Sequence, residues 1–237
     1  MRDGGTGGRG DGRTGRGLRM LIALAIVLSA LPPVLLSAQS PEAAAIIDRA
    51  VAAFAKVETL RADITMRLND PMLGTDLTSH GEYIAKRPNK FAMKWRQPPG
   101  DVILSDGRVL WVYLPSTTPG QVIRSTLQRG SSPDVLAEFL ERPREHFTIT
   151  FVRADSVGRR PVDVLSMTPT QEGTAYQRVL AWIDRQDNLP HRFDITETSG
   201  QIRHVTLDRI RVNTTVRAAE FVFTPPSGAR VVDATQP

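Results

Sequence analysis

The residues whose types and spacing suggest a shared chemical role are apolar rather than catalytic. Phe91, Met93 and Trp95 alternate along one expected strand, so their side chains point to the same side of it. Ile64 and Met66 alternate in the same way on an earlier strand. Aromatic rings and flexible thioethers suit a pocket for apolar groups of variable shape. The same pattern is typical of an ordinary packed core, which from these residues alone is the more common interpretation.

Polar residues with the spacing of a catalytic or metal site are absent from the sequence. No two histidines have the spacing of metal ligands on one element, and no cysteine accompanies them. The chain also has no G-x-S-x-G motif that would present a serine nucleophile. We therefore predict no catalytic residues, no metal and no cofactor, which disfavours a secreted hydrolase built on a β-scaffold. The histidines in question are His80, His146, His191 and His204.

Residues 1–38 have the order of a secretory signal peptide. Five arginines and two aspartates precede Met20, and a short apolar stretch with a small-residue end follows. We place the cleavage site after Ala38. An uncleaved membrane anchor is the alternative, which Pro32 and Pro33 disfavour because they interrupt the apolar stretch. The Gly/Arg-rich prefix leaves open whether translation starts at Met1 or at Met20.

The exported part of the chain is close to neutral and has no covalent cross-links. The whole sequence has 30 Lys+Arg and 25 Asp+Glu, and subtracting the five arginines and two aspartates of the leader leaves 25 and 23. This balance does not support a basic surface for nucleic acid. Without cysteine there is no disulfide, and the chain has no cysteine to which a lipid could be attached. We predict one monomeric domain over residues 39–237.

Two helices are expected. Residues 40–42 provide a capping serine, a proline for the first turn and an acidic side chain, and apolar positions then share one helical face as far as Val57. Residues 132–134 give a second start signal, and Pro143 is expected to stop that helix.

The rest of the chain alternates apolar and polar residues with the period of β-strands. Turn signals such as Asp106-Gly107 separate the segments, and the loop at 69–75 is of uncertain length. The pattern predicts one antiparallel meander of about eleven strands. Such a sheet must close, pair with another sheet or be covered by helices, so a curved sheet with a cavity and a filled sandwich both fit. The expected strand segments are 60–69, 77–86, 90–97, 101–105, 108–114, 120–126, 146–153, 162–168, 177–184, 191–198, 202–212 and 219–224.

An ordered set of motifs resembles the LolA family. The resemblance covers most of the exported chain, and its matches are densest over residues 86–115. The helix that precedes the first strand also lies where the family has one. The motifs are R-P-N-x-F at 87–91, Q-P at 97–98, S-D-G at 105–107, L-W-x-Y-x-P at 110–115 and F-x-F-x-P-P-x-G at 221–228.

The resemblance implies a fold and a function. LolA-like proteins are mainly β with helices (α+β) and form an incomplete antiparallel β-barrel, here of about eleven strands, with a helical lid. They carry the acyl chains of lipoproteins through the periplasm. Cargo comes from an inner-membrane lipoprotein-releasing ABC transporter and goes to an outer-membrane acceptor lipoprotein. The absence of cysteine favours the carrier over the acceptor, which shares the fold but is lipid-anchored.

With this resemblance, the alternating apolar residues are interpreted as a cavity wall. The alternation does not decide which face of the sheet Trp111 occupies. The predicted lipid-binding residues are Ile64, Met66, Phe91, Met93, Trp95 and Trp111.

Arg87 is the predicted lid latch. In the family, the arginine of the R-P motif bonds the backbone of a lid helix, and its planar fork of donors suits that role. We predict that Arg87 holds the segment around Leu136, Phe139 and Leu140. The alternative is an exposed arginine before a turn, since X-Pro favours turns.

The nearest rival functions use the same fold. They are a periplasmic binding protein for another lipid or glycolipid, and a lipid-sensing envelope-stress factor. Stress factors of this kind usually carry a second domain, for which residues 39–237 leave no room. An apolar pocket distinguishes acyl chains poorly, so the sequence leaves the identity of the cargo open.

Overall fold

The computed structural model describes residues 41–72, 74–127 and 134–234, all within a unit formed by residues 38–237. The predicted signal peptide at 1–38 therefore lies outside the described residues. Within the described ranges, none of the helices has the length and apolar character needed to traverse a membrane.

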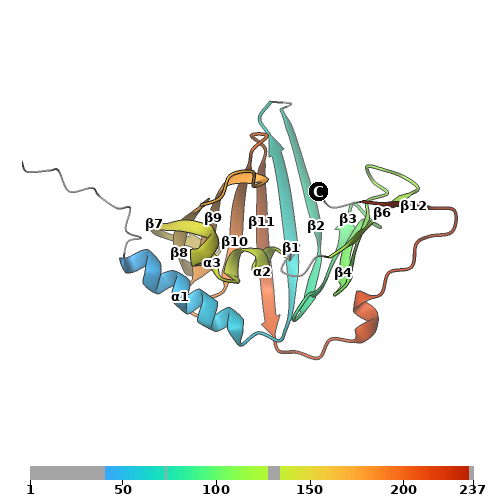
Figure 1. Ribbon diagram of the computed structural model, residues 1–237. Coiled ribbons are helices and arrows are strands. Elements are labelled where there is room, and N and C mark those ends of the chain that lie inside the picture. The colour runs from blue at the N-terminus through green and yellow to red at the C-terminus, as the bar shows by residue number, and fades with distance from the viewer. Residues whose placement is uncertain (1–40, 73, 128–133, 235–237) are drawn as a thin grey trace, which may run out of the picture. The chain divides into compact units, whose positions relative to one another are not determined.

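Twelve strands of the described chain form a single curved sheet (Figure 1). Its order is β12-β6-β5-β4-β3-β2-β1-β11-β10-β9-β8-β7, so two antiparallel meanders meet where β1 pairs with β11, and β12 adds in parallel to β6. The strands are β1 (Thr59–Asp70), β2 (Thr75–Lys86), β3 (Lys90–Gln97), β4 (Val102–Asp106), β5 (Val109–Tyr113), β6 (Gln121–Thr126), β7 (Phe147–Val157), β8 (Arg160–Pro169), β9 (Tyr176–Asp184), β10 (Pro190–Glu197), β11 (Ile202–Val212) and β12 (Arg230–Asp233).

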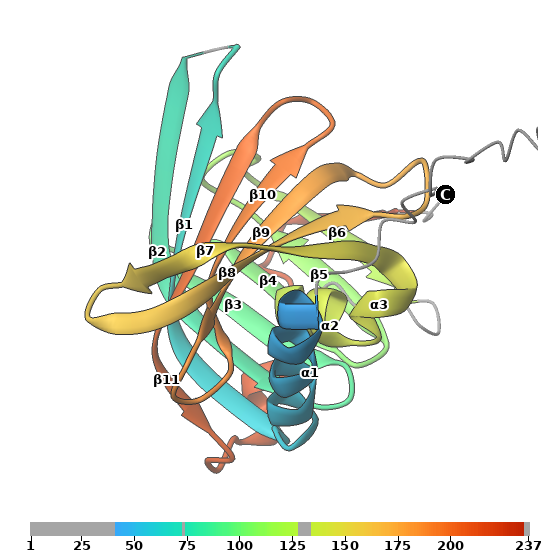
Figure 2. The same ribbon diagram turned by 90° about the vertical axis from the view of Figure 1, so that its left-hand side faces the viewer.

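Helices cover the concave face of the sheet (Figures 1 and 2). The helical elements are α1 (Pro41–Ala55), α2 (Val135–Leu140), α3 (Pro143–His146) and the 3-10 helix η1 (Ala218–Phe221). Buried side chains of α1 and α2 form one core cluster with the concave-face residues of the strands, among them Leu60, Ile64 and Phe193. Smaller clusters cover parts of the opposite face, one of them around Phe221 of η1. The apolar face predicted from the period-two pattern is therefore the concave one.

The predicted fold class is confirmed, and some of its details change. The sheet is an incomplete barrel whose two ends are β12 and β7. Eleven of the twelve expected segments are strands, the predicted strand at 219–224 is wrong, and β12 was not expected. That segment starts as η1 and then runs extended across the outer face, where Phe223 packs against Trp111. Its phenylalanines alternate as in a strand, but Pro225 and Pro226 cannot donate to a ladder.

Pro143 begins a helix instead of following one. α2 ends at Leu140, and Arg142 adopts a left-handed conformation with φ of 53°. A residue before proline avoids the right-handed helical region, and proline is well placed in the first turn of a helix. α3 therefore starts at Pro143 in a new direction.

Gly81 of β2 allows β2 and β3 to approach closely beneath a tryptophan. It pairs with Trp95 of β3, next to a register shift in the ladder. A Cβ atom at Gly81 would lie 2.5 Å from the Lys94 carbonyl oxygen and 2.9 Å from Cε3 of the Trp95 ring. Only glycine leaves room for the indole to lie across β2.

We expect Gly81→Ala to lower the free energy of unfolding by about 1–3 kcal/mol, because the added methyl group meets backbone as well as the ring. Urea denaturation measures this change. Thr78→Ala, at an exposed position of the same strand, should change it by less than about 0.5 kcal/mol. Equal stability of the two variants would show that the close approach at Gly81 imposes no constraint.

Candidate functional site

A cavity of about 350 Å³ lies between the concave face of the sheet and α2. Its volume is at the lower end of the range for small-molecule pockets. Strands β1, β3, β4, β10 and β11 and helix α2 supply its apolar wall, which consists of Ile64, Met66, Leu68, Met93, Trp95, Ile103, Val135, Ile195 and Val205. Four of the six predicted cavity residues, Ile64, Met66, Met93 and Trp95, are in this wall.

The other two predicted residues lie elsewhere. Phe91 is 1% exposed and belongs to the core cluster without lining the cavity. Trp111 is on the outer face, because it pairs with Leu104, the neighbour of the cavity residue Ile103, and neighbours along a strand point to opposite faces. Its ring packs against Phe223, with the centroids 5.7 Å apart. The structure therefore does not bring Trp111 to the cavity.

One end of the cavity is polar. Glu138, Glu197, Gln201 and Arg203 line it. Arg203 forms an ion pair with Glu197 across the β10–β11 hairpin. Gln201 donates a hydrogen bond of 2.8 Å from Nε2 to the carboxylate of Asp70 at the end of β1. An apolar chain in the cavity would thus have a hydrogen-bonding boundary at this end.

Three acidic residues of the α2 segment attach it to the sheet. Asp134 and Glu141 cap the two ends of α2, and Glu138 lies on the helix between them. Asp134 is the N-cap of α2 and also accepts a hydrogen bond from the hydroxyl of Tyr83 in β2. Glu138 lies near Tyr176 of β9, whose hydroxyl influences the pKa of this carboxyl.

Arg87, just after β2, connects the ends of two helices. Its Nη1 donates to the carbonyl of Phe54 near the end of α1 at 3.3 Å, and its Nη2 donates to Oε1 of Glu141, the C-cap of α2, at 3.4 Å. The guanidinium also lies 5.0 Å from the centroid of the Phe54 ring. The predicted partners Leu136, Phe139 and Leu140 are buried in the core, and Arg87 reaches the carboxylate that follows them.

A comparison with models of known protein families shows to which family the chain belongs. Residues 55–224 match the family model described as "Outer membrane lipoprotein carrier protein LolA". The chain belongs to the LolA family. Outer-membrane lipoprotein carrier proteins from two bacteria are similar to it: that of Alkalilimnicola ehrlichii is 27% identical, covering 91% of this chain and 94% of the relative, and that of Bordetella avium is 28% identical, covering 88% and 94%.

A solved structure supports the fold. A conserved protein of Thermus thermophilus superposes with a TM-score of 0.52 at 13% identity, covering 81% of this chain and 99% of its own. Because the identity is so low, this likeness concerns the fold alone.

Burial changes the ionisation of the acidic residues that attach α2 in this LolA-family chain. Desolvation raises the pKa of Asp134, although hydrogen bonds from Tyr83 and from two backbone amides oppose it. Desolvation likewise raises the pKa of Glu138, with Tyr176 and Arg203 acting in the opposite direction and Asp134 adding to the rise. Both tyrosine hydroxyls have raised pKa values, first because of their own burial and second because of the carboxylates. Both tyrosines therefore keep their protons at neutral pH, and Tyr83 donates its own to Asp134.

Sequence reasoning missed the Tyr83–Asp134 contact, which joins residues 51 positions apart. Two signals for it were present. Asp134 occupied a helix-start position, and Tyr83 fell on the apolar side of a predicted strand, where a buried hydroxyl needs a partner.

Sequence reasoning also missed a cluster of possible metal ligands at the β9–β10 turn. Single ligand atoms of Asp184, Asp187 and His191 lie within 4.8 Å of one another. Arg160 already bonds two of them, from Nε to Asp184 at 2.6 Å and from Nη2 to Asp187 at 2.8 Å. Burial alone would raise the pKa of Asp184, but Arg160 and the backbone amides of the turn lower it to about 2. The arginine thus supplies the charge that balances this turn.

We expect the stabilising effect of the Glu138 carboxyl to decline as pH rises. In the unfolded chain a glutamic acid loses its proton with a pKa of about 4.3. In the folded chain the pKa of Glu138 is raised, so its carboxyl group keeps the proton to a higher pH. Such a group stabilises most below the unfolded pKa and loses that contribution as pH passes the folded pKa. In urea denaturation between about pH 4 and pH 7, the free energy of unfolding of the wild type minus that of Glu138→Gln should fall. A constant difference across this range would contradict the assignment.

Proposed function

We propose that this chain is a periplasmic carrier that holds acyl chains of lipoproteins in the cavity beneath α2, without catalysing a reaction. The observation that carries the proposal is the apolar cavity between the sheet and α2 in a member of the LolA family. The names of the relatives in Alkalilimnicola ehrlichii and Bordetella avium support lipoprotein as the cargo.

The physical case rests on the cost of exposing lipid to water. Each exposed methylene costs about 0.8 kcal/mol, so an acyl chain cannot cross an aqueous space without a container. The wall offers Met66 and Met93, whose flexible side chains adapt to chains of different shape. The cavity is small for a lipid with several acyl chains, so loading such a cargo requires α2 to move away from the sheet.

The route of the cargo is the part of the proposal taken from the family. The chain would receive lipoproteins from an inner-membrane lipoprotein-releasing ABC transporter and deliver them to an outer-membrane acceptor lipoprotein. The signal-peptide pattern of residues 1–38 is consistent with export to the periplasm.

Arg87 would act as the latch of the closed, empty state. Its two hydrogen bonds tie the end of α1 to the end of α2, and both are long enough to be individually weak. Such contacts favour a closed cavity while permitting α2 to be displaced when cargo enters.

A charge in the cavity wall should prevent lipid binding. We expect Met66→Glu to reduce the lipid retained by protein purified from a membrane-containing host at least about tenfold, since burying a carboxylate beside an acyl chain is unfavourable. Native mass spectrometry followed by lipid extraction measures the bound lipid. Thr65→Glu, its neighbour on the opposite face of β1, is the matched control and should retain lipid. The carrier proposal fails if the wild type carries no lipid after incubation with a triacylated lipoprotein.

Loss of the latch should loosen α2. We expect Arg87→Leu to speed hydrogen exchange of the α2 backbone amides several-fold. The variant loses the hydrogen bonds from Arg87 to the Phe54 carbonyl of α1 and to Glu141 at the end of α2. It should also alter release of bound lipoprotein to an acceptor. Lys86→Leu changes the charge of an exposed neighbour and is the control. Unchanged exchange in α2, together with native release, would exclude a latch at Arg87.

A further inference from the structure

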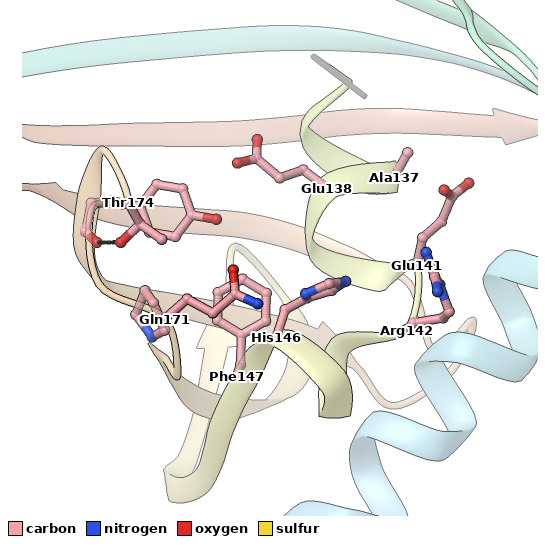
Figure 3. A pocket seen from close by; sticks show the side chains of 10 residues that line it. Ala137, Glu138, Glu141, Arg142, His146, Phe147, Gln171 and Thr174 are labelled. Carbon is pink, nitrogen blue, oxygen red and sulfur yellow. Dashed lines mark hydrogen bonds between the residues drawn. The ribbon is translucent and has the colours of Figure 1, made fainter. Parts of the chain in front are cut away.

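A second pocket lies beside α2, at its junction with α3 and the β8–β9 connection (Figure 3). Its volume is about 320 Å³. It shares Glu138 with the apolar cavity, so one side chain borders both spaces. The lining of the apolar cavity is mostly apolar, whereas that of this pocket is about half polar.

The lining combines donors with acceptors. His146, Gln171 and Arg142 can donate hydrogen bonds, and Glu138 and Glu141 accept them. Each peptide unit also carries one donor and one acceptor, so an amide-rich ligand can pair with both kinds of group. An anionic phosphate could use only the donors of this set and would leave the acceptors Glu138 and Glu141 facing it without a partner.

Two aromatic rings form part of the pocket lining. Phe147 and Tyr176 stack with their planes 19° apart and their centroids 6.2 Å apart. Thr174 closes the β8–β9 side by donating its hydroxyl to the carbonyl of Tyr176 at 2.8 Å. Phe147 is itself buried, so the half-buried ring of Tyr176 supplies the apolar contact that the carbon atoms of an extended peptide need, beside polar groups that can pair with its amides.

We propose that this polar pocket binds the first peptide units of an acylated peptide whose lipid tail occupies the apolar cavity, with Glu138 at the junction. This inference rests on the proposed carrier function and adds a second site to it. The apolar cavity recognises any acyl chain, and the polar pocket confers a preference for lipids that carry amides over lipids with an anionic headgroup.

The test compares ligands that share a tail and differ in their polar part. Dissociation constants are measured by displacement of a bound fluorescent fatty acid, with each ligand supplied in the same mild detergent, for palmitic acid, a dipalmitoylated cysteinyl tetrapeptide and dipalmitoyl phosphatidylglycerol. The variant is the double substitution His146→Ala and Gln171→Ala, which removes two donors of the polar pocket and leaves the apolar wall intact. Glu172→Ala, an exposed neighbour of Gln171, is the control.

The double variant should bind the lipopeptide about tenfold more weakly than the wild type, as expected for two lost hydrogen bonds. Its affinities for palmitic acid and for phosphatidylglycerol should stay unchanged, as should its melting temperature relative to the control. An unchanged lipopeptide affinity, or an equal loss for all three ligands, overturns the polar site while leaving the carrier function intact. If the wild type binds none of the three ligands, the proposed carrier function is refuted, and so is this inference.

Discussion

The connection between β6 and β7 constrains everything around the cavity. These strands are consecutive in the chain, yet β7 is one end of the sheet and β6 lies beside β12 at the other. The chain must therefore cross a whole face of the sheet between them. The described helices of this connection, α2 and α3, contribute Leu136, Phe139 and Pro143 to the buried interior. The covering of the cavity thus follows from the strand order, because the segment that links the two meanders is also the segment that lies over the concave face.

A helix of six residues cannot hold that position by itself. Helices shorter than about 12 residues are marginal in water, so α2 depends on its contacts with the sheet. Its apolar side is buried, and its polar attachments are single hydrogen bonds to Tyr83 and Arg87, with Tyr176 beside Glu138. A typical hydrogen bond contributes only about 1 kcal/mol net. The attachment of α2 is therefore a set of modest interactions that can break while the twelve-stranded sheet stays folded.

The sequence was sufficient for features that depend on neighbouring residues and insufficient for those that depend on long-range register. Period two located most strands and put Ile64, Met66, Met93 and Trp95 on one face, as the structure has them. The face of Trp111 depends on its pairing with Leu104, which alternation within its own strand cannot reveal. Contacts between distant segments were likewise beyond local patterns, since the pairing of β1 with β11 and the parallel addition of β12 join parts of the chain more than 100 residues apart. Arg87 was identified through its motif, whereas its contact with Phe54 needed the position of α1.

Strand β2 links the depth of the cavity to the attachment of its cover. Its concave-face positions run through Ser79, Gly81 and Tyr83, which pair with Met66, Ile64 and Ala62 of β1. The side chains of Ser79 and Gly81 are small, so they take up little of the cavity where the indole of Trp95 lies across Gly81. The next concave-face position is the large, fully buried Tyr83, whose hydroxyl reaches Asp134 at the start of α2, and the strand is followed by Arg87, which reaches its end. A shift of β2 by one residue would therefore fill the cavity and detach α2 together, so the register of this one strand sets both features.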